Sequence, residues 1–328
     1  METSLFLANL TSPPLLFFLL GAASALFRTD LEIPEAVARL LSLYLLMAIG
    51  FKGGVALSTS SLGFAELKGL LLAILMSVVV PIAVFYLLKG RLGPANAAAT
   101  AATYGSISAV TFVTATSYLD TAGVDWSGYL VAAMALMESP AIIIGLLLYR
   151  LYSTDEGAGF RARELLRESL LNGSVFLIVG SLVVGWISGP AGKDQVSVFI
   201  EGIFIGVLCL FLLDMGIVAM RRFEDMVRSD GGPSIPLLLV SGLVFPLTSA
   251  LAALGLSFVF GLPEGDAVLL VVLSASASYI AVPAAMRLAL PEANPSIYLT
   301  LSLAVTFPFN LLVGIPMYHQ AVQWIGLS

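Results

Sequence analysis

Two stretches rich in small and polar residues interrupt an otherwise apolar chain and decide how it folds. The first reads Thr103-Tyr-Gly-Ser-Ile-Ser-Ala-Val-Thr111, and the second reads Ser274-Ala-Ser-Ala-Ser-Tyr-Ile-Ala-Val-Pro283. Gly and Pro in an apolar segment free backbone groups that hydrocarbon cannot satisfy, so such backbone must line a cavity or lie buried in protein. We therefore expect two interrupted helices that cross at the middle of a membrane.

The composition around these stretches is that of a membrane protein. Of 328 residues, 59% are hydrophobic and 11% are charged, which excludes a soluble enzyme. The net charge of −6, without a long basic run, makes nucleic acid an unsuitable partner. A single cysteine, Cys209, excludes an intrachain disulfide and a Cys-based metal cluster. The start, Met1 to Ser4, lacks the positive region of a signal peptide, so we expect the first apolar segment to be retained.

The apolar segments predict an all-α membrane protein with ten spans. A span needs about 20 residues, because each residue rises about 1.5 Å through a hydrocarbon core about 30 Å thick. Gly-Pro pairs such as Gly93-Pro94 and Gly189-Pro190 set several of the ends. The predicted spans are residues 12–28, 36–58, 66–90, 97–119, 126–150, 170–189, 196–220, 235–261, 266–290 and 296–324.

The distribution of Lys and Arg predicts the orientation, since cytoplasmic loops collect these residues. Lys68 and Lys193 fall on one side and Lys52 lies within a span near its outer end. We expect both termini outside, in a bacterial inner membrane. The other side, predicted to be cytoplasmic, receives Arg28, Arg39, Lys89, Arg91, Arg150, Arg161, Arg163, Arg167, Arg221, Arg222, Arg228 and Arg287.

The chain divides into two halves that resemble each other weakly. We predict a first five-helix repeat at residues 1–153, a short cytoplasmic linker at 154–169 and a second repeat at 170–328. An odd number of spans in each half gives the halves opposite orientations, as in inverted-repeat transporters. Matching prolines support the repeat, with Pro81 and Pro140 in the first half and Pro246 and Pro308 in the second.

The two interrupted segments predict a site for a small anion. Opposed helix N-termini offer partial positive charge and free N–H groups, and hydroxyl groups can complete the coordination. The alternative is that Ser, Gly and Ala only permit close helix packing. The candidate substrate-binding residues are Tyr104, Gly105, Ser106, Ser108, Ser276, Ser278 and Tyr279.

One acidic residue, Glu138, falls at membrane depth. It lies about 12 residues into its span, roughly 18 Å from the start, where its side chain cannot reach water. It either ligates a coupling cation such as sodium or stays protonated as a structural hydrogen-bond donor. The candidate cation ligands are Glu138, Ser139, Thr111, Thr306 and Asn310. Asp214 is expected to pair with Arg221, and His319 to lie at the outer interface.

The sequence resembles the sodium-dependent bicarbonate symporter family known from cyanobacteria and other bacteria. The resemblance covers nearly the whole chain and rests on the order and spacing of short motifs. These motifs are Leu31-Glu-Ile-Pro-Glu-Ala-Val37, Ile49-Gly-Phe-Lys-Gly-Gly54, Gly105-Ser-Ile-Ser108, Met137-Glu-Ser-Pro140, Ser274-Ala-Ser-Ala-Ser278 and Pro291-Glu-Ala-Asn-Pro-Ser-Ile-Tyr298.

The resemblance implies a core domain, a gate domain and a homotrimer, with bicarbonate and sodium bound where the interrupted helices cross. Cyanobacterial members carry Asp where this chain has Tyr279 and Glu138. They also have a longer central loop and bind a PII-like signalling protein, and the short loop here argues against that partner.

We therefore interpret the chain as a secondary transporter that imports bicarbonate with sodium by alternating access, without a further cofactor. The open alternatives are a sodium- or proton-coupled carrier of another small anion, a symporter of a larger organic anion and an anion channel. An intramembrane enzyme is disfavoured, because one His and few buried carboxylates supply no ligand set or nucleophile–base pair.

Overall fold

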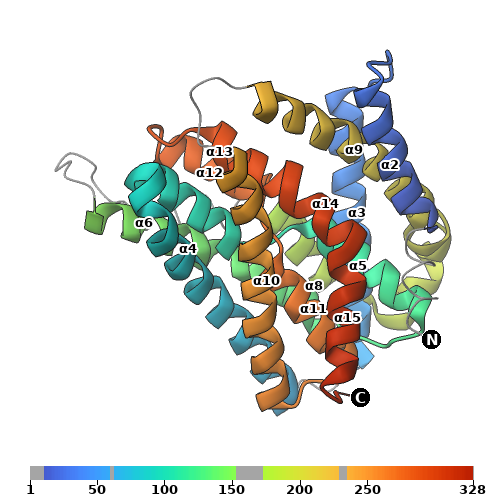
Figure 1. Cartoon of the computed structure of the whole chain (residues 1–328). Helices are drawn as coiled ribbons and strands as arrows, with labels where there is room; N and C mark the ends of the chain where they lie inside the picture. The colour runs from blue at the N-terminus through green and yellow to red at the C-terminus, as the bar shows by residue number, and fades with distance from the viewer. Residues whose placement is uncertain (1–10, 60–62, 153–172, 229–234, 328) are drawn as a thin grey trace.

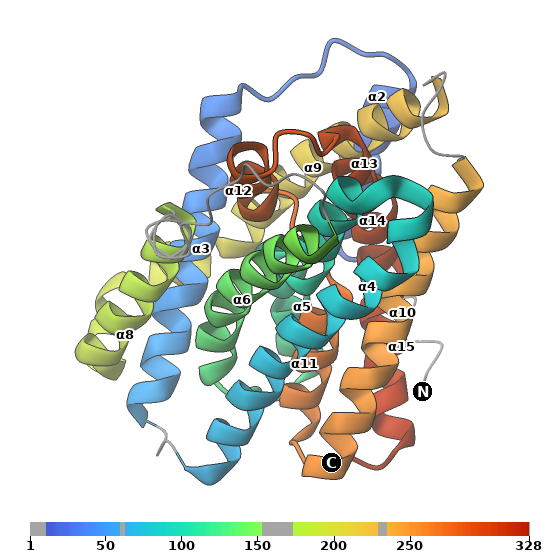
Figure 2. The ribbon, with the colours of Figure 1, turned by 90° about the vertical axis from the view of Figure 1, so that its left-hand side faces the viewer.

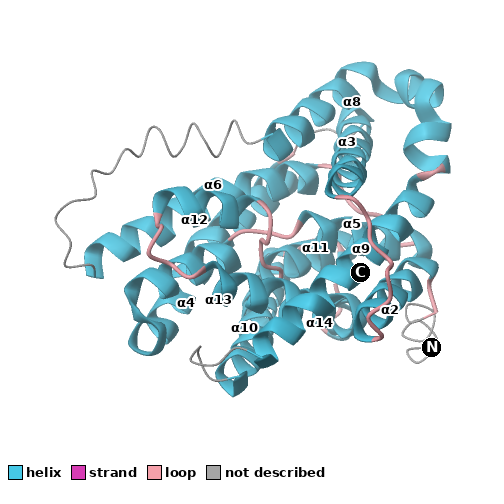
Figure 3. Cartoon of the chain, turned by 90° about the horizontal axis from the view of Figure 1, so that it is seen from above, coloured by secondary structure: helices cyan, strands magenta, loops and turns pink. Residues whose placement is uncertain are grey.

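A computed structural model of the chain describes residues 11–59, 63–152, 173–228 and 235–327. Every regular element in these ranges is helical, as Figure 3 shows, which confirms the predicted all-α class. The predicted linker, residues 154–169, lies outside the described residues. The main helices are α2 (Pro13–Leu26), α3 (Glu35–Thr59), α4 (Phe64–Gly105), α5 (Ala109–Ala122), α6 (Tyr129–Tyr152), α8 (Gly173–Ser197), α9 (Phe204–Arg228), α10 (Ile235–Phe260), α11 (Glu264–Ala275), α12 (Ala281–Ala289), α13 (Pro295–Leu299), α14 (Phe307–Phe309) and α15 (Ile315–Trp324).

Within the described residues, six continuous helical stretches are long and apolar enough to cross a membrane. Their outward faces carry large apolar side chains such as Leu251, which is 70% exposed, and Val259, which is 74% exposed. Such side chains are stable in contact with lipid and costly in contact with water. The chain is therefore a multi-pass membrane protein. The six stretches are Glu35–Thr59, Glu66–Ala122, Tyr129–Tyr152, Phe176–Asp225, Ile235–Phe260 and Pro295–Trp324.

Two of these stretches contain 57 and 50 residues and do not run straight. Straight helices of that length would measure roughly 85 Å and 75 Å, more than twice the thickness of the hydrocarbon core. The backbone turns at Gly93 (φ 76°) and at Gly189 (φ 58°), where the left-handed conformation suits glycine. Both glycines precede proline, which cannot continue the preceding helix. These turns lie where the sequence predicted the ends of two spans.

The two predicted interrupted helices are confirmed. α4 ends at Gly105 and α5 begins at Ala109, while α11 ends at Ala275 and α12 begins at Ala281. Figure 2 shows α5 and α11 in the interior of the molecule, between α6 and α10. All four helix ends therefore lie close to the centre of the protein.

Four helices form a group beside the interrupted helices, and we call α2, α3, α8 and α9 the four-helix group (Figures 1 and 2). Within this group α2 packs along α9 and α3 packs along α8. Glycine allows both contacts. A Cβ atom on Gly54 would lie 2.0 Å from the Leu182 carbonyl oxygen, and one on Gly21 would lie 2.0 Å from that of Leu213. Small residues let membrane helices approach to backbone contact, so these pairs are tightly joined.

We call the remaining helices the crossing group. Here α4 packs along α6, and α10 packs along α11. The last helical stretch alternates short α-helices with π-helical turns, η2 (Thr300–Thr306) and η3 (Asn310–Gly314). Pro308 and Pro316 lack N–H groups, so this stretch cannot keep a regular α-helical ladder.

Candidate functional site

The two helix breaks touch each other directly. The backbone N–H of Ser108 in the first break donates to Oγ of Ser276 in the second, at 3.0 Å. In return, the N–H of Ser278 donates to the carbonyl oxygen of Thr103, at 2.9 Å. Residues about 170 positions apart therefore satisfy each other's backbone groups, as unwound backbone at membrane depth requires.

A cavity of about 50 Å³ lies beside this contact, between the breaks and the four-helix group. One water needs roughly 10–15 Å³ measured in this way, so the cavity holds a few waters or a small ion with its partner. Both breaks contribute residues at the beginning of a helix, where the first N–H groups have no partner within the helix. The lining residues are Ser42, Leu45, Leu46, Ile107, Ser108, Ala109, Val110, Val113, Met134, Ala135, Glu138, Ile178, Phe211, Ser278, Tyr279, Ile280 and Ala281.

Three hydroxyl groups in the cavity wall can donate to an anion. Oγ of Ser108 accepts hydrogen bonds from the N–H and the Oγ1 of Thr111, at 3.1 and 2.9 Å, which leaves its own proton available. Oγ of Ser278 accepts from the N–H of Val282 at 3.3 Å and likewise keeps its proton. The Tyr279 hydroxyl is buried close to the Ser108 hydroxyl, without a well-formed hydrogen bond to any described residue. The wall therefore offers donors in addition to the partial positive charge of two helix N-termini.

Glu138 brings a carboxylate into the same wall. Its side chain is 8% exposed and makes no hydrogen bond with the described residues. A charged carboxylate in such a place is costly unless a cation or a donor accompanies it. The cavity thus combines an acceptor from α6 with donors from both breaks, which is the chemistry for a cation and an anion side by side.

The other candidate substrate residues lie in the contact between helices and not in the described lining of the cavity. The Tyr104 hydroxyl is 2.6 Å from Oγ1 of Thr306. A Cβ atom on Gly105 would lie 2.1 Å from Cγ of Pro81, so this glycine permits packing. Ser106 is fully buried, and its Oγ has no hydrogen-bond partner within the described residues. Oγ of Ser276 donates to the Leu273 carbonyl and accepts from Ser108.

The candidate cation ligands are divided between several places. Thr111 does not line the cavity, but its Oγ1 donates a hydrogen bond to Oγ of Ser108, which does. Oγ1 of Thr306 donates to the carbonyl of Gly242 at 2.7 Å. Nδ2 of Asn310 donates to the carbonyl of Ala275 at 2.9 Å and so holds the end of α11. Ser139 is buried on α6 next to Glu138 but does not line the cavity. Among this set, the structure brings only Glu138 to the cavity.

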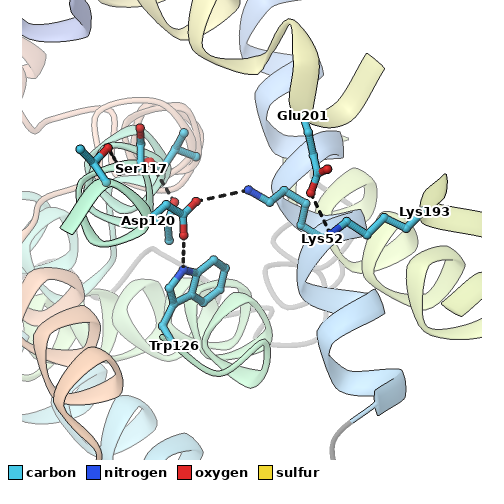
Figure 4. Close-up of polar contacts among 9 residues, drawn as sticks. Lys52, Ser117, Asp120, Trp126, Lys193 and Glu201 are labelled. Atoms are coloured by element: carbon cyan, nitrogen blue, oxygen red, sulfur yellow. Dashed lines mark hydrogen bonds and ion pairs between the residues drawn. The ribbon is translucent and has the colours of Figure 1, made fainter. Parts of the chain in front are cut away.

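A salt bridge joins the two helix groups at one end of the molecule, as Figure 4 shows. Nζ of Lys52, on α3, lies 3.4 Å from Oδ2 of Asp120, near the end of α5. Trp126 Nε1 holds the other carboxylate oxygen at 3.0 Å. Close by, Lys193 pairs with Glu201 at 2.9 Å. We call the pair formed by Lys52 and Asp120 the outer bridge.

At the opposite end a second cavity, of about 620 Å³, adjoins the central one. The two cavities share Ser42, Phe211, Tyr279 and Ile280 as lining residues. We call the larger one the arginine vestibule because Arg39, Arg222 and Arg287 line it. The central cavity therefore adjoins a larger cavity on the side of the arginines. At the other end of the molecule, the outer bridge joins the two helix groups.

The surroundings of two further ionisable residues are visible in the structure. His319 is buried in the protein, with its Nε2 atom 2.9 Å from Oε1 of Glu264 and its Nδ1 atom 3.0 Å from the Tyr118 hydroxyl. Arg221 forms its ion pair with Glu32, with its Nη1 atom 3.8 Å from Oε1. It is nevertheless near enough to Asp214, about two helical turns away, for its charge to act on that carboxylate.

Sequence reasoning missed several wall residues. Ser42 and Phe211 come from apolar segments of α3 and α9 with no polar pattern to single them out. Ile280 and Ala281 carry no functional side chain and matter through the backbone at the start of α12. A helix break can be recognised in the sequence from its own Gly, Ser and Pro residues. The helices of the four-helix group that complete the cavity wall have no such pattern, so their lining residues could not be predicted.

A comparison with protein-family models matches residues 13–323 to the Na⁺-dependent bicarbonate transporter superfamily. The match covers nearly the whole chain, including both helix breaks, Glu138 and the arginine vestibule. A search of curated proteins found no match.

Proposed function

Because the chain belongs to the Na⁺-dependent bicarbonate transporter superfamily, we propose that it is a secondary transporter that carries bicarbonate together with sodium across a bacterial inner membrane. The observation that supports this most strongly is the central cavity. It joins hydroxyl donors and helix N-termini from both breaks to one buried carboxylate, Glu138.

The size of the cavity favours a small anion as the substrate. A volume of about 50 Å³ suits an ion of a few heavy atoms and excludes an organic anion of steroid size from this site. We propose that Ser108, Ser278 and Tyr279 bind bicarbonate with the N–H groups that begin α5 and α12. Glu138 binds sodium, and the charges of the two ions compensate each other in a site of low dielectric constant.

For the architecture we propose ten spans in two inverted five-helix repeats. The helix pairs in the four-helix group support this arrangement. The first helix of one half, α2, packs on the second helix of the other half, α9, and the second helix, α3, packs on the first helix of the other half, α8. A pseudo-twofold axis in the membrane plane relates the two pairs in this way.

Alternating access is the transport mechanism that we propose. The outer bridge joins the helix groups at one end, while the central cavity adjoins the arginine vestibule at the other. The arginines mark the cytoplasmic side if cations are retained there, so the conformation is open to the inside. Movement of the four-helix group against the crossing group would break the outer bridge and open the site outward. We further propose a homotrimer, as the resemblance implies, with both termini outside, as the distribution of Lys and Arg indicates.

Uptake of labelled bicarbonate into proteoliposomes tests the proposal. We expect concentrative uptake with an inward sodium gradient, and little with a potassium gradient of equal size. Liposomes without protein and liposomes with Glu138→Gln serve as controls. Uptake that ignores sodium, or fails to rise above the external concentration, would contradict coupled transport and favour a channel or another coupling ion.

A further inference from the structure

The arginine vestibule holds three guanidinium groups without a carboxylate in its described wall. Arg39 comes from α3, Arg222 from α9 and Arg287 from α12. The other described lining residues are neutral, namely Ala38, Ser42, Leu43, Gly173, Phe211, Met215, Val218, Tyr279, Ile280, Pro283, Leu299 and Leu303. Three like charges around one hollow create a positive potential that attracts anions.

Two other arginines of α9, Arg221 and Arg228, form ion pairs with carboxylates. Arg221 lies 3.8 Å from Glu32, and Arg228 lies 3.0 Å from Glu224. No described carboxylate forms an ion pair with the three vestibule arginines, and Arg287 lies close to the Tyr298 hydroxyl. Arginine in a concave site whose described wall holds no carboxylate is suited to phosphate, because its planar group donates two parallel hydrogen bonds to such oxygens.

The dimensions of the vestibule indicate a multivalent ligand and not the transported ion. At about 620 Å³ it is roughly twelve times larger than the central cavity of about 50 Å³. A monovalent anion of a few atoms fills only a small part of this volume and brings one negative charge to three guanidinium groups. An anion with several phosphate oxygens can meet them together and offset their mutual repulsion.

We propose that the arginine vestibule is a binding site for a multivalent phosphate anion, which arrests transport from this side. Arg39 and Arg222 belong to the four-helix group, whereas Arg287 belongs to the crossing group. A ligand held by both groups ties them together in the present conformation and covers the exit from the central cavity. The arrest rests on the proposed transport function, but the binding does not.

Calorimetric titration of the protein in nanodiscs of zwitterionic lipid tests the binding, with sodium pyrophosphate as the probe at constant total sodium. We expect one saturable site per chain. Each of Arg39→Gln, Arg222→Gln and Arg287→Gln should weaken it roughly tenfold or more, since each removes a charge-assisted hydrogen bond. The matched control is Arg221→Gln, which alters the adjacent residue outside the vestibule and should leave the affinity unchanged. Thermal unfolding of each variant verifies that it is folded.

A second series replaces part of the lipid with phosphatidylglycerol, because a lipid headgroup could supply the same phosphate chemistry. Loss of pyrophosphate binding in these nanodiscs, with arginine-dependent thermal stabilisation instead, would identify lipid as the source of the phosphate. Absence of arginine-dependent binding in both series would overturn the site. Equal pyrophosphate affinity in all four variants and the wild type would overturn it as well.

Flux measurements separate this proposal from the proposed transport function. Pyrophosphate enclosed in proteoliposomes should slow bicarbonate exchange by wild type and by Arg221→Gln, and should affect Arg222→Gln much less. Arginine-dependent binding by a protein that carries no bicarbonate would disprove the transport function and leave the site standing. Binding without any slowing of an active transporter would disprove the arrest.

Discussion

The two helix breaks follow one plan, but their polar groups are satisfied differently. In the second break, Oγ of Ser276 both accepts and donates a hydrogen bond. At the equivalent position in the first break, Ser106 is equally buried, and its Oγ has no partner among the described residues. The second break is not fully satisfied either, because Oγ of Ser274, at the end of α11, is also buried without a partner among the described residues. An unsatisfied buried hydroxyl costs about 1–3 kcal/mol, so both breaks carry such a cost, at different positions. A repeated motif can therefore place its unsatisfied hydroxyl at a different position in each copy.

Gly105→Val should produce the largest loss of stability, because it adds a side chain at a tightly packed position beside the first break. The new side chain would overlap Pro81 on the same helix hairpin. Overpacking typically costs about 1–3 kcal/mol and occasionally more, so we expect a clear fall in unfolding temperature and in yield. Gly90→Val is the matched control, since a Cβ on Gly90 meets no atom within 4 Å. A wild-type unfolding temperature for Gly105→Val would disprove the packing role.

Glu138→Gln should abolish sodium dependence while leaving the fold intact. The substitution removes the charge at nearly constant shape, and no hydrogen bond to the described residues is lost. We expect sodium stimulation of uptake to fall at least about tenfold, the loss of roughly one charge-assisted contact. Asp214→Asn removes a buried carboxylate outside the cavity and should keep normal sodium activation. A sodium-activation curve unchanged by Glu138→Gln would favour the structural alternative.

Serine-to-alanine changes in the two breaks test which hydroxyl groups bind the anion. Ser108→Ala removes an anion donor and the N-cap of α5, so bicarbonate affinity should fall about five- to 150-fold and stability by about 1 kcal/mol. Ser278→Ala should affect affinity similarly. Ser106→Ala removes an unpartnered hydroxyl and should leave affinity unchanged with equal or higher stability. If Ser106→Ala weakened bicarbonate binding while Ser108→Ala did not, the anion site would lie on the other side of the break.

Breaking the outer bridge should have the smallest effect. Its side chains are 21% and 47% exposed, and exposed ion pairs contribute about 0.2–1 kcal/mol. Lys52→Gln should therefore shift the conformational equilibrium by no more than about fivefold. Labelling of a cysteine at Ser117, in a Cys209→Ala background, reports the opening and should speed up. Exchange of the two charges, Lys52→Asp with Asp120→Lys, should restore slow labelling. Identical labelling in all variants would exclude a gating role.

Much of this arrangement follows from the sequence for a physical reason. Gly and Pro in an apolar segment interrupt or bend a helix. The breaks at residues 106–108 and 276–280 and the turns at Gly93 and Gly189 could therefore be predicted. Glu138 could be singled out as a candidate because a carboxylate at membrane depth is costly and is rarely found there without a function. Where the other predicted cation ligands lie could not be foreseen from the sequence, because residues at similar depth can face different helices. Thr306 and Asn310 instead bind backbone carbonyls of α10 and α11.

The glycine contact between α2 and α9 also constrains how the protein is made. Gly21 and Leu213 lie 192 positions apart in the chain. At about 5–20 residues per second, the ribosome completes the partner of α2 roughly 10–40 s after α2 itself. During that interval α2, only 14 residues long, stays in the translocon or the lipid without its packing surface. Biogenesis therefore includes a waiting period in which the first helix depends on other contacts, and the four-helix group can close only when most of the chain has been synthesised.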